Sequence, residues 1–154
     1  MAQTIENRLA DLGITLPTPA APAANYVPFV RTGSLLFVSG QIPMGDNGIE
    51  HIGKLGADYD VAKGQEAARL CAINILAQAK AALGDLEAIG QLVKLTAFVN
   101  STGDFGDQPK VVNGASDFLV EVLGDRGKHS RSAVGVAALP FGVAVEIEAI
   151  FEIA

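Results

Sequence analysis

A long β-strand is predicted near the C-terminus, where apolar and polar residues alternate without a break. From residue 143 to residue 153 every second residue is apolar, and Glu146, Glu148 and Glu152 stand between them. Successive side chains of a strand point to opposite faces, so one face of this strand is expected to be buried and the other to carry the acids.

The same period of two predicts a strand over residues 91–100. Its buried face is expected to hold Val93, Leu95, Ala97 and Val99. Residues 26–31 and 35–39 favour strands and are separated by a short loop with Gly33, which predicts a hairpin. Further strands are expected over residues 131–139 and, within a glycine-rich loop, over residues 49–54.

Apolar residues spaced three or four apart predict three helices. The longest spans residues 61–83, between Asp60 as the N-cap and Gly84 as the stop. The second covers residues 109–123, and a short third covers residues 5–12.

Helices that return the chain between strands predict an α+β fold, in which one mixed sheet carries two helices on one face. The opposite face would then carry several apolar residues among its charges: Leu92, Thr96, Phe98, Ala144, Ile150, Val134 and Val136. Leaving such a face in water is costly, so we expect it to be buried against further copies of the chain in a closed ring.

The chain is expected to divide into two unequal parts. Residues 1–22 form the short helix and an arm with prolines at 17, 19 and 22, which cannot be helical because proline lacks the amide hydrogen. Residues 23–154 form the main domain, whose size suits one hydrophobic core.

Acidic residues number 17 against 11 basic ones, which gives a net charge of −6. This balance argues against a large surface for nucleic acids. The first residues lack the basic start and apolar run of a secretory signal, and residues 133–145, the longest uncharged stretch near the C-terminus, are too short to span a bilayer. We therefore expect a cytoplasmic protein that does not bind a membrane.

The sequence gives no support to metal or cofactor chemistry. Histidine and cysteine are limited to His51, Cys71 and His129, without CxxC or HxxxH spacing. Neither GxGxxG nor GxxxxGK[ST] occurs. We expect no metal and no organic cofactor, and we interpret Cys71, in an apolar stretch of the longest helix, as a buried residue.

Arg131 and the acids of the last strand each allow two interpretations. Arg131 begins an apolar strand, either as an ordinary surface residue or as a guanidinium whose planar fork binds a carboxylate. Glu146 and Glu148 mark a solvated face, or else serve a function if that face lies between subunits. His129 is either a solvated loop residue or a residue at the mouth of a site.

Five segments carry a resemblance to a known family. They are residues 37–43 (FVSGQIP), 93–100 (VKLTAFVN), 112–113 (VN), 131–140 (RSAVGVAALP) and 145–150 (VEIEAI). In this order the segments resemble the RidA family, also called YjgF or reactive-intermediate deaminases and, in older usage, L-PSP endoribonucleases. The resemblance covers residues 26–152, and the N-terminal extension looks like that of the longer subgroup.

The resemblance implies a chorismate-mutase-like (Bacillus-type) fold and a homotrimer, in which three sheets enclose a central β-barrel and the helices lie outside. It also implies that a small ligand with a carboxylate binds in the cleft between neighbouring subunits. Carried over position by position, Arg131 would hold the carboxylate and Glu146 would act beside a water molecule. The remaining pocket residues would be Tyr26, Ser39, Gly40 and Asn113.

The activity implied by the resemblance is hydrolytic deamination of small enamine or imine acids to 2-keto acids and ammonia. The family often has a cysteine two residues after the arginine, where this chain has Ala133. A cysteine nucleophile is therefore excluded at that position, whereas hydrolysis by water is not. Two alternatives stay open: a non-catalytic trimer that binds small carboxylates, and an endoribonuclease, against which the acidic charge counts.

Overall fold

The main sheet of the protein is mixed and has five strands. A computed structural model describes residues 3–19 and 25–154. In spatial order the strands are β1 (Phe29–Thr32), β2 (Leu35–Gln41), β7 (Val145–Ile153), β5 (Ile89–Asn100) and β6 (Ser130–Val136). Only β5 and β6 are parallel; the other neighbours are antiparallel. The mixed sheet of an α+β fold is therefore confirmed.

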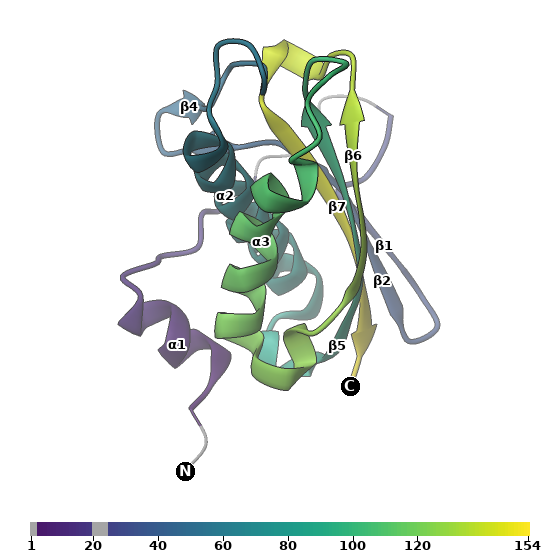
Figure 1. Ribbon diagram of the computed structural model, residues 1–154. Coiled ribbons are helices and arrows are strands. Elements are labelled where there is room, and N and C mark those ends of the chain that lie inside the picture. Colours follow the sequence, from purple (N-terminus) through teal and green to yellow (C-terminus); the bar gives the residue numbers. More distant parts are fainter. Residues whose placement is uncertain (1–2, 20–24) are drawn as a thin grey trace.

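Two long helices cover one face of this sheet (Figure 1). They are α2 (Val61–Leu83) and α3 (Gln108–Leu123), whose predicted extents are confirmed. Asp60 caps α2 by accepting a hydrogen bond from the Lys63 amide at 2.8 Å. The two helices approach closely at Gly114, where a Cβ atom would lie 2.1 Å from the backbone oxygen of Gln65. Only glycine allows this contact.

The alternation predicted for the last strand is confirmed. In β7 the residues that face α2 and α3 are buried, and these are Val145, Ile147, Ala149 and Phe151. Leu95, Ala97 and Val99 of β5 are fully buried beside them. Together with the helices, these rows form a single hydrophobic core.

The pairing of β7 with its neighbours is irregular at several points, and one of them, in β5, changes which side chains face the core. The pairing with β7 shifts between Leu92 and Lys94, and the extra residue reverses the direction of the side chains there. Leu92 is fully buried, whereas Val93 is 36% exposed. The predictions that Val93 faces the core and that Leu92 faces away from it are both wrong, because they assumed a strand without a bulge.

Two further expectations are also wrong. Ala144 is fully buried before the start of β7, where its amide donates to the His51 carbonyl, so it does not belong to the open face. The predicted strand over residues 49–54 does not form. A separate hairpin joins β3 (Met44–Gly45) to β4 (Gly48–Ile49), and His51 then adopts a φ of 57°, which ends the extended conformation.

The other face of the sheet carries apolar side chains that are partly exposed. Val134 is 44% exposed, and Phe98, Ile150 and Val136 are half-buried on the same face, as predicted. Val30 and Phe37 extend this surface onto β1 and β2. In Figure 1 no described helix or strand covers this face.

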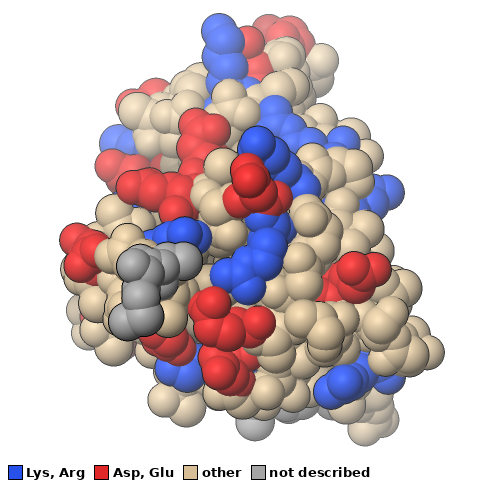
Figure 2. Space-filling view, turned by 90° about the horizontal axis from the view of Figure 1, so that it is seen from below, with Lys and Arg blue, Asp and Glu red and all other residues tan. Residues whose placement is uncertain are grey.

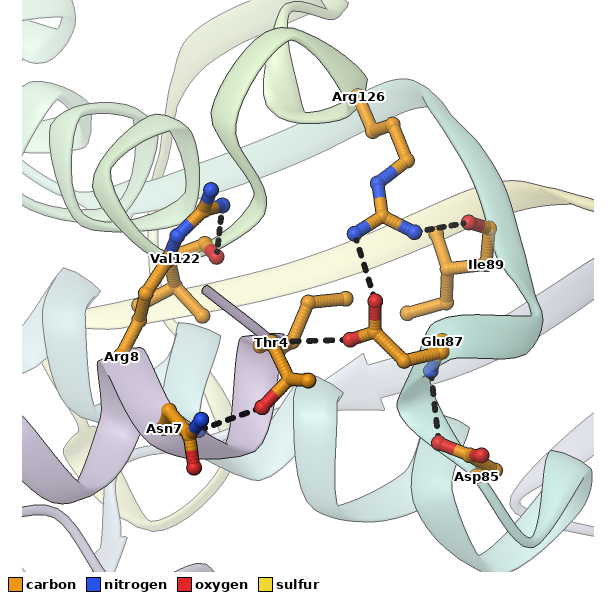
Figure 3. A network of polar contacts seen from close by, with 9 residues as sticks. Thr4, Asn7, Arg8, Asp85, Glu87, Ile89, Val122 and Arg126 are labelled. Carbon is orange, nitrogen blue, oxygen red and sulfur yellow. Dashed lines mark hydrogen bonds and ion pairs between the residues drawn. The ribbon is translucent and has the colours of Figure 1, made fainter. Parts of the chain in front are cut away.

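The first helix, α1 (Ile5–Asp11), packs against the same core through Ile5 and Leu9. Figure 3 shows the polar contacts that fix its start. Glu87, in the 3-10 turn η1 (Leu86–Ala88), accepts a hydrogen bond from the Ile5 amide at 2.8 Å. Its carboxylate also forms an ion pair with Arg126 at 3.2 Å. The arm beyond α1 is irregular over residues 14–19; Pro22 and the predicted boundary at residues 22–23 lie outside the described residues.

We expect Glu87→Ala to lower the free energy of unfolding by about 1–2 kcal/mol. The substitution removes the acceptor for the Ile5 amide and leaves the Arg126 guanidinium without its acid. Denaturant unfolding measures the loss. Lys128→Ala, which removes only an exposed ion pair with Asp125, is the control and should stay within about 0.5 kcal/mol of the wild type. An equal loss in both variants would contradict the assignment.

Candidate functional site

The predicted site residues fall into two groups. The first lies where β2 and β7 meet the segment before β1. Ser39 donates its hydroxyl to the Val27 carbonyl at 2.9 Å, which holds the segment containing Tyr26 against β2. Tyr26, Ser39 and Gly40 line one cavity beside α2, and the Tyr26 side chain is 57% exposed.

Glu146 completes this first group. A Cβ atom on Gly40 would lie 3.0 Å from the Glu146 carboxyl carbon, so the glycine allows the carboxyl group to rest on the β2 backbone. Burial, followed by the charge of Glu148, raises the pKa of Glu146 above its ordinary value. A half-buried carboxylate with a raised pKa holds a proton more readily than an ordinary glutamate, which suits it to taking a proton from water and returning it.

The second group lies between β6 and α3. Arg131 donates from Nη1 to the Ser116 hydroxyl at 3.0 Å and from Nη2 to the Pro109 carbonyl at 3.3 Å. Both acceptors are neutral, so the guanidinium is positioned without being neutralised. Asn113 stands on α3 three residues before Ser116, which puts it on the same side of the helix.

His129 is connected to Arg131 through Ser116. Its Nδ1 lies 2.6 Å from the Gly127 carbonyl, which can only accept, so Nδ1 carries a proton. In the neutral ring Nε2 then accepts the Ser116 hydroxyl proton at 2.9 Å, and the Ser116 oxygen is left to accept from Arg131. His129 is therefore neither a free loop residue nor in contact with the acids, but part of the support for the guanidinium.

A single chain does not bring the two groups together. Arg131 pairs with Leu95 in a row that faces the helices, whereas Glu146 pairs with Phe98 in a row on the open face. The two functional side chains thus lie on opposite faces of the sheet, and β5 separates their strands. The first group has an acid without a cation, and the second has a cation without an acid.

Two residues near these groups were missed by sequence reasoning. Ser116 could have been found from its helical spacing to Asn113, but nothing in the sequence connects it to Arg131. Gln78 lines the same cavity as Ser39 and is 94% buried, although glutamine within a helix ordinarily marks a solvated face.

Cys71 is fully buried, as predicted, and burial raises the pKa of its thiol well above the ordinary value. Within the described stretches, no three His, Cys, Asp or Glu side chains gather as a metal site would require. None of the helices in residues 3–19 and 25–154 combines the length and hydropathy needed to cross a bilayer.

The end of the molecule that carries α1 shows basic and acidic side chains next to one another (Figure 2). Three ion pairs at this end join residues of opposite charge: Lys80–Glu6, Arg126–Glu87 and Lys128–Asp125. Such a mixture differs from the continuous basic surface that attracts a phosphate backbone.

The chain is similar to known proteins over most of its length. Residues 6–150 match the family model described as "YjgF/chorismate_mutase-like, putative endoribonuclease". The chain is 52% identical to Protein TCP17 of Trypanosoma cruzi over 146 residues, which are 94% of this chain and 91% of that protein. It is 33% identical to the 2-iminobutanoate/2-iminopropanoate deaminase of Escherichia coli strain K12 over 147 residues, covering 88% of this chain and 94% of that protein.

Among solved structures, the protein Atu1372 of Agrobacterium tumefaciens, described as having unknown function, superposes with a TM-score of 0.91. Its sequence is 54% identical, and the alignment covers 98% of this chain and 94% of that one.

Proposed function

The chain belongs to the YjgF/chorismate-mutase-like family and has its α+β fold, and from this premise we propose that it hydrolyses small 2-imino or enamine acids to 2-keto acids and ammonia. The family includes proteins named as deaminases and others described as endoribonucleases. The observation that carries the proposal is the separation of Arg131 from Glu146. Imine hydrolysis needs a cation to bind the substrate carboxylate and an acid–base group to activate water, and each group of residues holds one of the two.

The two halves meet if the β6–α3 edge of one subunit lies beside the β2–β7 region of the next. A homotrimer closed around the open sheet face achieves this and also buries Val134, Phe98 and Ile150. Each cleft then contains Arg131 and Asn113 from one chain, with Tyr26, Ser39, Gly40 and Glu146 from its neighbour.

In the proposed reaction Arg131 binds the substrate carboxylate through two parallel hydrogen bonds and so fixes the position of the imine carbon. Glu146 accepts a proton from water while the water oxygen bonds to that carbon, and the electron pair of the C=N bond moves to nitrogen. Glu146 returns this proton to nitrogen, which gives a carbinolamine. The carbinolamine hydroxyl then passes its proton through Glu146 to the same nitrogen, while the C–N bond breaks and the C=O bond forms. The products are a 2-keto acid and ammonia, and the chemistry requires neither a metal nor an organic cofactor.

The test is ammonia and keto-acid release from a panel of imines generated from different amino acids, measured against the uncatalysed rate. Acceleration in the wild type that is lost in Glu146→Gln supports the proposal. Binding of carboxylates that depends on Arg131, without acceleration, would identify a binding protein instead.

An endoribonuclease is the second candidate, because the family description names that activity. The net charge of −6 counts against it. Cleavage of single-stranded RNA by wild type, but not by Arg131→Ala or Glu146→Gln, would support this activity. Cleavage that survives both substitutions would indicate a contaminant.

We expect sedimentation at micromolar concentration to give three times the 15.9 kDa mass of one chain. Val134→Asp should split the assembly, since it places a charge on the apolar face at a position that is 44% exposed in the single chain. Glu121→Lys, which changes the charge by two units on the exposed side of α3, is the control and should leave the mass unaltered. A stable wild-type monomer would contradict the proposed assembly and the shared site.

A further inference from the structure

The guanidinium of Arg131 is held by a chain of hydrogen bonds that ends at a histidine. Arg131 donates to the Ser116 hydroxyl at 3.0 Å, and this hydroxyl lies 2.9 Å from His129 Nε2. The other ring nitrogen of His129 is fixed by its proton on the Gly127 carbonyl, at 2.6 Å. His129 therefore reaches the carboxylate anchor through a single hydroxyl group.

The backbone on both sides of His129 is tied to β5. The Gln91 side-chain amide donates to the Lys128 carbonyl at 2.5 Å, and the Ser130 hydroxyl donates to the Val93 carbonyl at 2.9 Å. The imidazole is thus held beside α3 by its backbone as well as by the bonds of its ring.

The charge of the ring decides what His129 offers to Ser116. The neutral ring accepts the hydroxyl proton at Nε2, whereas the imidazolium carries a proton on both nitrogens and can only donate. Ser116 then accepts from His129 as well as from Arg131. A second positive charge stands one hydroxyl away from the guanidinium, and a carboxylate bound to Arg131 offsets it.

Other charges around His129 are screened or paired. Arg126 pairs with Glu87 at 3.2 Å. The remaining charged side chains of α3, β5 and residues 124–128 are exposed to solvent, where their effects are screened. They are Lys94, Lys110, Asp117, Glu121, Asp125 and Lys128. In the proposed cleft the neighbouring subunit adds Glu146 and Glu148.

We propose that His129 is a positioning residue of the carboxylate anchor and acts on Arg131 through Ser116. The neutral ring turns the Ser116 oxygen towards Arg131, and the charged ring strengthens the hold on a carboxylate. Affinity for small carboxylates therefore rises as the pH falls and His129 gains its proton. This inference rests on the proposed function, in which Arg131 binds the substrate carboxylate.

Calorimetric titration with pyruvate from about pH 8 to about pH 5 tests the proposal, because histidine side chains change charge in this range while pyruvate stays ionised. Every protein carries Glu146→Gln, since the Glu146 carboxyl has a raised pKa and would add its own pH dependence. This parent variant should bind pyruvate about three- to tenfold more tightly at the acidic end than at the basic end.

His129→Gln keeps a neutral acceptor for Ser116 but cannot gain a charge. In the parent background it should match the parent near pH 8 and lose most of the rise at low pH. His51→Gln is the matched control, because it changes the other histidine of the chain, which bonds Tyr59 at 2.7 Å, and it should keep the rise.

A double-mutant cycle near pH 8 tests the route through Ser116. His129→Ala and Ser116→Ala should each weaken pyruvate binding, and the two together should weaken it no more than Ser116→Ala alone. Thermal unfolding and sedimentation show that each variant keeps its fold and assembly.

The outcomes separate this inference from the proposed function. A rise at low pH that survives His129→Gln, or losses that add in the cycle, overturns the role of His129 and leaves Arg131 as the anchor. A rise that depends on His129, without imine hydrolysis by the protein with Glu146 intact, sustains the role and overturns the deaminase. Failure of pyruvate to bind overturns the role of His129, and the imine assay then decides the function alone.

Discussion

Glu146→Gln is expected to lower the turnover of a 2-imino acid by about 10²–10⁴-fold, the usual range for loss of a general acid–base group. Affinity for an unreactive carboxylate should alter far less. The amide keeps the size and most of the hydrogen-bonding reach of the acid but cannot accept the proton of the attacking water. Its position against Gly40 is also preserved, because glutamine and glutamate have the same length.

The measurement is steady-state ammonia release beside calorimetric titration of a benzoate-like ligand. Glu148→Gln is the matched control, since Glu148 lies two residues further along the same face of β7. Its effect on turnover at neutral pH should be small. Equal losses in the two variants, or full turnover in Glu146→Gln, would mean that Glu146 is not the acid beside the water.

The pH dependence follows from the raised pKa of Glu146. The base form exists above this pKa, so kcat should fall as the pH is lowered through it, at a pH above the usual range of a glutamate side chain. The charge of Glu148 is the smaller of the two causes of the shift. Glu148→Gln should therefore move this acidic limb to lower pH, whereas a limb that does not respond belongs to another group.

The folding stability of Glu146→Gln gives an independent control, because we expect the substitution to lower turnover but not to lower stability. A carboxyl group whose pKa is higher in the folded than in the unfolded state binds more protons when folded. Its contribution to stability is thus greatest at low pH and is lost as the pH rises through the folded pKa. At neutral pH Glu146→Gln relieves that penalty, so its unfolding temperature should equal or exceed that of the wild type. A loss of turnover then cannot be attributed to unfolding.

Much of the fold could be predicted because local rules and tertiary packing agree. The helix of residues 61–83 begins and ends at its capping residues, and the acids of β7 alternate with buried apolar residues. The errors came where one residue altered the pattern. The bulge at Leu92 depends on the pairing of β5 with β7. The left-handed backbone conformation at residue 51 could not be predicted, because the residue is histidine and not the glycine that usually marks such a conformation.

The site was less accessible to sequence reasoning, because it depends on which face each strand presents. The pattern could assign the faces of β7, but Arg131 was placed only at the start of a strand, and its contacts with Ser116 and Pro109 arise from the packing of α3 on β6. The burial of Gln78 is equally a tertiary property. The sequence pattern therefore could not show that Glu146 and Arg131 lie on opposite faces of the sheet. This separation is the main argument for a site shared between two subunits.

Arg131→Ala and Arg131→Lys are both expected to weaken a pyruvate-like or benzoate-like ligand by about tenfold or more. A hydrogen bond to a charged group contributes about 1.5–3 kcal/mol, and about 1.4 kcal/mol corresponds to a factor of ten in affinity. Lysine keeps the charge but loses the planar fork that makes two parallel bonds to a carboxylate. Alanine loses both.

The contacts of Arg131 explain why the guanidinium is available to a ligand. Its two contacts, with the Ser116 hydroxyl and the Pro109 carbonyl, orient the fork while leaving the positive charge uncompensated. A ligand carboxylate supplies the missing charge. Ser116→Ala is therefore expected to weaken binding less than either Arg131 substitution, because it removes one orienting contact and keeps the cation.

Calorimetric titration into wild type, the two Arg131 variants and Ser116→Ala gives the comparison, and sedimentation shows whether each variant keeps its assembly. The contacts of Arg131 are made within its own chain, on the helix side of β6, so assembly should survive all three substitutions. A graded loss, with Ser116→Ala between wild type and Arg131→Lys, is the result expected of an oriented carboxylate anchor. Equal affinity across intact assemblies would make Arg131 a structural residue that holds α3 against β6, and the anion site would then have to lie elsewhere.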